Sequence, residues 1–316
     1  MELKGMHHVT AVTGDVGGNV RFYVNTLGLR LVKKTVNQDD LGAYHLFYAD
    51  EVGTAGTEVT FFDWPRVPKR SHGAGTVRRT LLRIPASQAA LSWWQEHLKR
   101  SGVESERVGF AGGREAILFS DPEGQQLALV ADPYTGEAKP WAAGPVPAEY
   151  AIGGLLGAEV HSAFPERSAL FLQEYLGIRE ATGLPQDESR RIFRIESDVS
   201  VAELHIVSGG TGSFGQVGIG GVHHLALRVE NDDEQREWLE YLTGRGVPNS
   251  GLVDRHYFHS LYFREPGGIL LEVATAGPGF LGDENVEHLG ETLSLPPFLE
   301  PRRDEIEAGL QPIPAV

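Results

Sequence analysis

Residues 20–29 read VRFYVNTLGL and residues 170–178 read LFLQEYLGI, so one pattern of apolar and aromatic residues ending in Leu-Gly occurs twice. The two glycines, Gly28 and Gly177, lie 149 positions apart (177 − 28 = 149). Glycine directly after an amphipathic segment is typical of the end of a helix. The pattern therefore predicts two equivalent helices inside an internal repeat, and the repeat decides the fold.

A second pair of segments repeats at a different offset. Residues 101–103 (SGV) match residues 245–247 (RGV), and residues 121–124 (DPEG) match residues 265–268 (EPGG). Both matches are 144 positions apart (245 − 101 = 144 and 265 − 121 = 144). Because a helix end and a turn share one offset, whole modules are repeated rather than single dipeptides.

Four modules account for most of the chain, and each reads as a strand, a helix and further short alternating strands. They cover about residues 7–62, 76–130, 152–207 and 222–273. Helices are expected over residues 18–27, 87–100, 168–176 and 233–245. We therefore predict an α+β fold of four βαβββ modules that form two half-barrels.

The modules suggest a division into two domains and a tail. Residues 1–140 would hold modules one and two, and residues 150–280 would hold modules three and four. The stretch 134–149 is rich in Pro, Gly and Ala and reads as the linker. Residues 281–316 form a C-terminal tail that ends in a charged helical piece over 301–309.

Composition limits the classes of function. The net charge of −15 argues against a nucleic-acid partner, which would need a concentrated basic surface. The absence of cysteine excludes disulfides, thiolate metal sites and a cysteine nucleophile. No apolar stretch is long enough for a membrane span and the start has no signal-peptide pattern, so we expect a cytoplasmic protein without membrane contact. The sequence does not indicate the oligomeric state, and a homo-oligomer remains open.

Two histidine pairs occupy the same place in different modules. His7-His8 opens module one, and His223-His224 opens module four. Because neighbouring side chains of a strand point to opposite faces, we expect only one histidine of each pair to face a shared pocket. Glu272 lies in the apolar run 268–274 (GILLEVA), where burying an ionised carboxylate requires a compensating charge. A divalent metal on His8, His224 and Glu272 meets that requirement.

The repeat contains its own control for this metal site. The position in module three that corresponds to His8 is Gly157. In module two, the position that corresponds to His224 is Thr80, or Arg79 after a slip of one residue, and the position that corresponds to Glu272 is Ala128. The late strand of module one has Phe61 at the symmetric position. Only modules one and four carry candidate ligands, so the site requires these two modules to face each other.

Two histidines and one carboxylate with open positions are typical of non-haem Fe(II) oxygenases. With neutral imidazoles and one carboxylate the site keeps a charge of about +1, which suits one deprotonated substrate hydroxyl. Fe(II) is therefore the expected cofactor. Zn, Ni or Mn are alternative occupants in a purified sample, because affinity alone does not select iron.

Segments along nearly the whole chain resemble a known family. They are HHVTAVTGD (7–15), FYVNTLGLRLVKKTVNQDD (22–40), YHLFYADEVGTAGTEVTFF (44–62), GVHHLALRV (221–229), DRHYFHSLYFREPGGILLEVAT (254–275) and LPPFLEPRRDEI (295–306). Together they resemble the hydroquinone-type, extradiol ring-cleaving dioxygenases of the vicinal oxygen chelate (glyoxalase/bleomycin resistance/dioxygenase) superfamily. The resemblance implies two vicinal-oxygen-chelate half-barrels, Fe(II) on His8, His224 and Glu272, and cleavage of a small aromatic diol with O2.

The resemblance also implies roles around the metal. Tyr262, Arg255 and His223 are expected to be catalytic, with Arg255 holding a substrate oxygen and Tyr262 or a flanking histidine moving protons. Residues expected to bind substrate or to support the metal ligands are His7, Thr10 and His256. The implied process is the degradation of an aromatic compound.

Other functions stay open at this point. A metal-dependent isomerase or lyase of the glyoxalase type would use four protein ligands, often two glutamates, and Phe61 at the fourth position opposes it. A resistance protein that binds an aromatic compound without turnover would usually lack the triad. An intact metal site could also serve a catechol instead of a hydroquinone.

Overall fold

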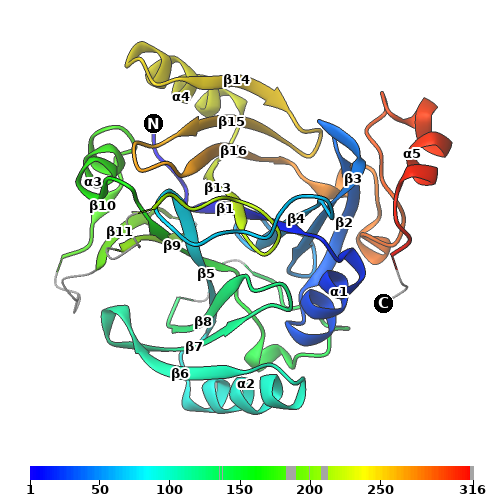
Figure 1. The fold of residues 1–316 in the computed structure, drawn as a ribbon, viewed down its shortest axis with the longest axis horizontal. Helices are drawn as coiled ribbons and strands as arrows, with labels where there is room; N and C mark the ends of the chain where they lie inside the picture. Colours follow the sequence, from blue (N-terminus) through cyan, green and yellow to red (C-terminus); the bar gives the residue numbers. More distant parts are fainter. Residues whose placement is uncertain (135, 137, 183–189, 199, 208–212, 314–316) are drawn as a thin grey trace.

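Four βαβββ modules follow one another along the chain, which confirms the α+β fold (Figure 1). The computed structural model describes residues 1–316 except 135, 137, 183–189, 199, 208–212 and 314–316. In modules one and two the strands and helices are β1 (Met6–Thr13), α1 (Val16–Val20), β2 (Arg30–Asn37), β3 (Asp40–Ala49), β4 (Glu58–Asp63), β5 (Thr76–Pro85), α2 (Gln88–Arg100), β6 (Ser105–Phe110), β7 (Arg114–Ser120) and β8 (Gln126–Asp132). In modules three and four they are β9 (Leu155–His161), α3 (Pro165–Glu174), β10 (Arg179–Glu180), β11 (Arg190–Glu196), β12 (Val201–Val207), β13 (Val222–Val229), α4 (Asp232–Gly244), β14 (Asn249–Asp254), β15 (Phe258–Arg264) and β16 (Leu270–Pro278).

The helices begin and end where the local sequence directs them. Ser87 caps α2 by accepting a hydrogen bond from the backbone N–H of Ala90, and Asn231 caps α4 in the same way. The α3 helix begins at Pro165, three residues before the expected start, because proline fits the first helical position. The helix of module one is shorter than expected: α1 passes into a π-helical turn over Arg21–Thr26, and Gly28 follows with φ +70°.

Two eight-stranded sheets are built from these modules. The first has the order β14-β15-β16-β13-β1-β4-β3-β2 and joins module one to module four through the antiparallel pair β1 and β13. The second has the order β10-β11-β12-β9-β5-β8-β7-β6 and joins module two to module three. Modules one and four therefore share a sheet, as the candidate ligands require. The boundaries at 140 and 150 stay a prediction, and each sheet joins modules from both sides of them.

The first sheet has one polar face and one apolar face. Along β1, His8 and Thr10 alternate with Val9 and Ala11, and the latter two belong to the main hydrophobic core. Along β4 the same alternation separates Thr60 from its apolar neighbours. The polar face is therefore free to carry a site, while the apolar face holds the sheet in the protein.

The tail closes part of the first sheet. It contains short turns and α5 (Arg303–Gly309), which falls inside the expected helical piece and lies beside β3 in Figure 1. Phe280, directly before the tail, and Leu289 of the tail pack against Phe47 and Tyr257 in a separate apolar cluster. In the part of the chain that the structure describes, no helix combines the length and the apolar character needed to cross a membrane.

Candidate metal centre

Both histidine pairs lie in β-bulges where β1 meets β13. Three steps along β1, from Met6 to Val9, match only two steps along β13, so one extra residue is inserted at His7-His8. Two steps along β13, from Val222 to His224, match one step along β1, which inserts an extra residue at His223. A bulge re-aims the side chains next to it and often lies beside a functional site.

Only one histidine of each pair lines the cavity, as expected, although the bulges bring the two rings of a pair into contact. The Nδ1 atoms of His7 and His8 are 2.9 Å apart, and those of His223 and His224 are 2.8 Å apart. Simple alternation does not hold where a strand carries an extra residue. His8 and His224 line the cavity, whereas His7 and His223 stand directly behind them.

Three ligand atoms converge from three neighbouring strands. The Nε2 atoms of His8 and His224 are 3.1 Å apart, and Glu272 Oε2 lies 3.3 Å from the first and 2.9 Å from the second. All three residues are buried. The other carboxylate oxygen of Glu272 accepts a hydrogen bond of 2.6 Å from Ser260 Oγ, which fixes the orientation of the carboxylate.

The charge states of these groups suit a cation. Burial opposes ionisation of Glu272, but the adjacent His8 and His224 hold its pKa well below the usual range. Burial lowers the pKa of His8, which favours the neutral imidazole that ligates metals. Glu272 Oε2 has no hydrogen-bond partner among the described residues. A buried carboxylate oxygen beside two imidazole nitrogens is the donor set of a 2-His-1-carboxylate site, so the residues fit a divalent metal.

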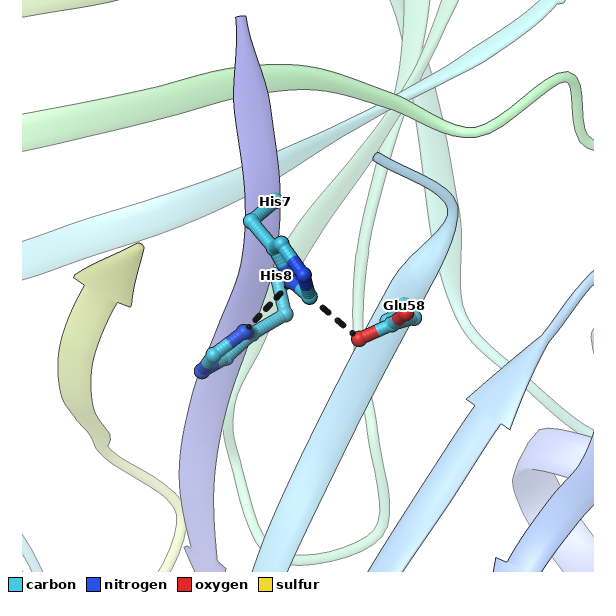
Figure 2. A group of neighbouring side chains, drawn as sticks. All are labelled: His7, His8 and Glu58. Atoms are coloured by element: carbon cyan, nitrogen blue, oxygen red, sulfur yellow. Dashed lines mark hydrogen bonds and ion pairs between the residues drawn. The ribbon is translucent and has the colours of Figure 1, made fainter. Parts of the chain in front are cut away.

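A chain of contacts behind His8 controls its tautomer (Figure 2). The backbone carbonyl of Thr275 lies 3.0 Å from His7 Nε2 and can only accept, so this nitrogen carries a proton. In a neutral His7 the Nδ1 atom is then bare and accepts from Nδ1–H of His8. That arrangement leaves Nε2 of His8 free for a metal.

Glu58 approaches the same histidine from β4. Its Oε2 atom lies 3.4 Å from His7 Nδ1, and both side chains are buried. Burial lowers the pKa of His7, but Glu58 outweighs it and leaves the pKa above the usual value. Figure 2 shows Glu58 on the side of His7 away from the His8 ring. The protonated form that Glu58 favours donates from Nδ1, so the acceptor role towards His8 belongs to the neutral form of His7 alone.

Two of the expected catalytic residues line the cavity beside the metal candidates. Tyr262 lies opposite Glu272 in the strand register, and its ring centroid is 5.6 Å from that of His224. Burial and the nearby Glu272 raise the pKa of Tyr262, so its hydroxyl stays protonated. Arg255 lies at the cavity wall and its Nη2 is 2.8 Å from Asp39 Oδ2.

The other expected residues lie further from the cavity. His223 stands behind His224, and burial together with His224 lowers its pKa to about 3, so it is neutral. Thr10 Oγ1 is 2.8 Å from Thr60 Oγ1 at the buried polar face. His256 occupies a turn with φ +72° and does not itself line the cavity, although its ring packs 4.8 Å from that of the lining residue Tyr257.

The strand register corrects one position of the internal control. Glu272 pairs with Ala226, two residues after His224, and Thr60 pairs with Thr10, two residues after His8. The position symmetric to Glu272 is therefore Thr60 and not Phe61. The site has no carboxylate at this fourth position.

The second sheet repeats the bulges but not the ligands. An extra residue precedes Arg79 in β5 as it precedes His224 in β13, so Arg79, not Thr80, is equivalent to that histidine. Gly157 follows a bulge in β9, and a Cβ there would collide with the carbonyl oxygen of Glu203. Arg79 Nη1 lies 2.6 Å from Glu159 Oε2, so a guanidinium occupies this place.

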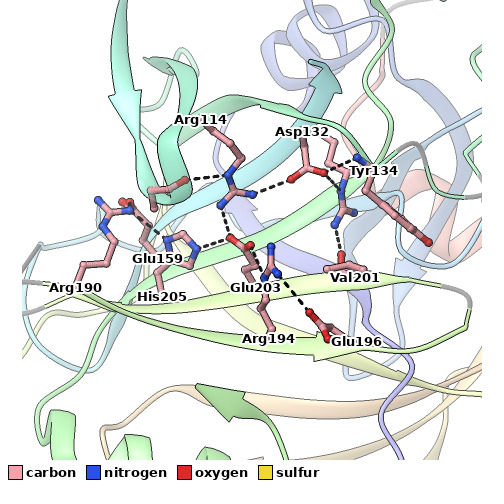
Figure 3. A network of polar contacts seen from close by, with 12 residues as sticks. Arg114, Asp132, Tyr134, Glu159, Arg190, Arg194, Glu196, Val201, Glu203 and His205 are labelled. Carbon is pink, nitrogen blue, oxygen red and sulfur yellow. Dashed lines mark hydrogen bonds and ion pairs between the residues drawn. The ribbon is translucent and has the colours of Figure 1, made fainter. Parts of the chain in front are cut away.

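Buried ion pairs fill the interior of the second sheet (Figure 3). Glu203 accepts hydrogen bonds from Arg114 (2.6 Å), Arg194 (3.1 Å) and His205 (2.8 Å). Although burial opposes its ionisation, the hydrogen bonds from His205 and Arg114 lower the pKa of Glu203 to about 2. Fixed cations here take the place that a metal would take in the first sheet.

Sequence reasoning missed Glu58, Ser260 and Asp39. Glu58 lies on β4 in register with His8, and a carboxylate in an apolar strand was the signal that identified Glu272. Ser260 faces Glu272 only through the pairing of β15 with β16. Asp39 meets Arg255 across 216 residues of sequence, so no local pattern could reveal the contact.

Comparison with known proteins assigns the family. The family model described as Glyoxalase/Bleomycin resistance protein/Dioxygenase superfamily matches residues 5–129 and 158–273. The chain belongs to this superfamily. It is 41% identical to "Putative ring-cleaving dioxygenase MhqA" of Bacillus subtilis over 99% of this chain and 100% of the relative. It is 32% identical to "Chlorohydroquinone/hydroquinone 1,2-dioxygenase" of Sphingobium indicum over 96% of this chain and 95% of the relative.

Solved structures of the superfamily share the fold. A crystal structure described as a "putative dioxygenase" of Bacillus subtilis has a TM-score of 0.92 at 36% identity, and covers 99% of this chain and 98% of its own. Glyoxalase I of Zea mays has a TM-score of 0.62 at 17% identity over 86% of this chain and 92% of its own, which shows the fold alone. The two half-barrels expected from the sequence are confirmed.

Proposed function

We propose that this member of the superfamily is a ring-cleaving dioxygenase that holds Fe(II) on His8, His224 and Glu272 and opens the ring of a hydroquinone-like substrate with O2. The observation that carries the proposal is the convergence of two imidazole nitrogens on one buried carboxylate oxygen of Glu272. Relatives named ring-cleaving and hydroquinone dioxygenases, similar over nearly their whole length, support the reaction class.

The cavity beside these atoms suits a flat aromatic ring. Its walls include Phe47, Phe62 and Phe258, which offer ring faces and edges and exclude water. Bound Fe(II) would supply open positions for a ring hydroxylate and for O2. An aromatic diol therefore meets both the shape and the charge of the site.

Two side chains of this cavity suit the charge that develops during the reaction. Arg255 stays a cation, since Tyr262 and the ion pair with Asp39 outweigh burial and raise its pKa. It can stabilise negative charge on a substrate oxygen. Tyr262 keeps its proton and acts as a hydrogen-bond donor at the ligand side of the cavity, rather than as a base.

The first experiment tests the metal and the reaction together. The protein is loaded with Fe(II) without O2, hydroquinone is added, O2 is admitted, and O2 uptake is followed with the product spectrum. We expect one O2 consumed per hydroquinone, and we expect His8→Ala and Glu272→Ala to lose bound iron and uptake. A wild-type chain with one iron and no uptake on any hydroquinone would contradict the proposal.

A glyoxalase-type isomerase is the second candidate. The residue at the fourth candidate ligand position, symmetric to Glu272, argues against it. Thr60 stands there, with its hydroxyl 2.8 Å from Thr10 Oγ1 and 3.1 Å from His45 Nε2. A neutral hydroxyl held by two neighbours does not replace the second carboxylate expected for that chemistry.

A further inference from the structure

One buried hydroxyl in the cavity has no partner. Thr35 lies on β2, is 4% exposed and lines the cavity that contains His8 and His224. Its Oγ1 has no hydrogen-bond partner among the described residues. A buried hydroxyl left unpaired destabilises the folded state, and a polar group of a ligand in the cavity would satisfy it.

Next to this hydroxyl lies an imidazole with a hydrogen-bond partner at one of its two ring nitrogens. His45 on β3 is the direct cross-strand partner of Thr35 and lines the same cavity. Its Nε2 lies 3.1 Å from Thr60 Oγ1, and its Nδ1 has no partner in the described part of the chain. Burial, with His8 and His224 nearby, lowers its pKa well below the usual value, so the ring is neutral.

The imidazole is held in place by aromatic rings and hydroxyls. Its centroid lies 4.0 Å from that of Phe47 and 4.6 Å from that of Phe62. Thr60 in turn contacts Thr10 at 2.8 Å. Since either threonine can donate, His45 Nδ1 can present a lone pair or a proton to a ligand.

The sheet sets the distance between this polar pair and the metal ligands. His45 on β3 lies two strands from β1, roughly 10 Å along the sheet, and Thr35 on β2 lies one strand further. A para diol bound to the metal must span the distance from β1 to His45. That spacing suits a metal–oxygen bond, a benzene ring with para oxygens and one further hydrogen bond. An ortho diol would instead place both oxygens at the metal.

We propose that Thr35 and His45 bind the second, para hydroxyl of the substrate and thereby select 1,4-dihydroxybenzenes. The proposal rests on the proposed ring-cleaving function and names the residues that would set its substrate class. Thr35 supplies a hydroxyl and His45 supplies Nδ1, while Phe47 and Phe62 pack around the ring between them and the metal.

The test removes one hydroxyl at a time, from the protein and from the ligand. Hydroquinone, phenol and catechol are titrated into the Fe(II)-loaded protein without O2 by calorimetry. We expect the wild type to bind hydroquinone about 10-fold more tightly than phenol, as one or two neutral hydrogen bonds provide. Thr35→Val and His45→Phe should each bring the two ligands within about threefold of each other. Binding of catechol should not change in either variant.

Matched variants separate the effect of the Thr35 hydroxyl and the His45 nitrogen from the effect of side-chain packing. Thr35→Ser keeps the hydroxyl and should keep the preference, and His45→Asn should restore part of it. Circular dichroism and iron content show that each variant is folded and loaded, and Thr35→Val alone decides if His45→Phe does not fold.

The outcomes distinguish the two proposals. Hydroquinone binding with the full preference intact in Thr35→Val overturns the role of these residues and leaves the ring-cleaving function standing. A loaded wild type that binds neither hydroquinone nor phenol overturns both.

Discussion

The orientation of one imidazole decides whether a metal can bind. His8 can offer Nε2 to a metal when its proton is on Nδ1, and neutral His7 stabilises that tautomer by accepting from Nδ1–H at 2.9 Å. The carbonyl of Thr275 fixes His7 in turn. Residues that hold a metal-bound histidine in this way commonly contribute as much as a weak ligand.

Replacing His7 should weaken metal binding without touching a ligand. We expect His7→Phe to lower the affinity for Fe(II) or Zn(II) about 10- to 100-fold, because His8 then loses the acceptor for its Nδ1–H. Competition with a chelator during equilibrium dialysis measures the change. His72→Phe, at an exposed histidine, is the control and should bind like the wild type. Equal affinities in both variants would show that His8 does not depend on its neighbour.

At the scale of the element, the bulge belongs to the fold rather than to the metal. It recurs in β1 and β13, which carry the histidine pairs, and in β5 and β9, which carry none. The sequence could predict the modules and the convergence of His8, His224 and Glu272, because both follow from repeat offsets. It could not place His7 and His223 beside their neighbours, since a bulge depends on the partner strand.

Turns also connect the modules. Asp121, in the turn between β7 and β8, accepts hydrogen bonds from the backbone N–H groups of Glu123 and Gln125. Its second oxygen accepts a hydrogen bond of 3.2 Å from Tyr23 in the π-helical turn of module one. Burial raises the pKa of Asp121 to about 6 despite these donors, so the fold favours its neutral form.

Asp121 should make stability depend on pH. Its folded pKa of about 6 exceeds the unfolded value near 3.9, so its favourable contribution is present below about pH 4 and is lost as pH rises through 6. Asp121→Asn mimics the neutral form and should raise the free energy of unfolding by about 1–2 kcal/mol above pH 6. Urea unfolding at pH 7.5 and 4.5 measures this gain. A gain that is equal or larger at pH 4.5 would contradict the assignment.

In the whole molecule, the same arrangement of modules occurs twice, and the two sheets enclose different polar groups. The first sheet gathers imidazoles and an anionic carboxylate around a cavity, whereas the second fills the same place with guanidinium groups of Arg79 and Arg114 paired with glutamates. The candidate ligands implied that modules one and four face each other, but local sequence could not give the β1–β13 pairing itself, because it joins segments more than 200 residues apart. It did not predict either that Asp283 of the tail would accept a hydrogen bond from Tyr257 at the cavity wall.

The tail is anchored on a buried lysine. Lys33 has no exposed surface, and its ammonium lies 2.7 Å from Asp283, contacts Glu284 and lies 4.8 Å from the centre of the Tyr257 ring. The Tyr257 hydroxyl donates to Asp283 at 2.8 Å, and Tyr257 lines the cavity. The tail therefore holds both a buried charge and a wall of the cavity.

Removing the two tail carboxylates should lower the stability of the protein and disturb the cavity wall at the same time. Asp283→Asn with Glu284→Gln leaves the Lys33 ammonium buried without a counter-charge, which should lower the free energy of unfolding by about 3–5 kcal/mol. Adding Lys33→Met to this variant should recover most of the loss, because no charge then remains buried. Adding Lys34→Met instead, at the partly exposed neighbour, should not. Urea unfolding measures stability, and the KM for hydroquinone reports the cavity wall. If the double variant unfolds like the wild type, Lys33 reaches water or another partner, and the tail is not held by this charge.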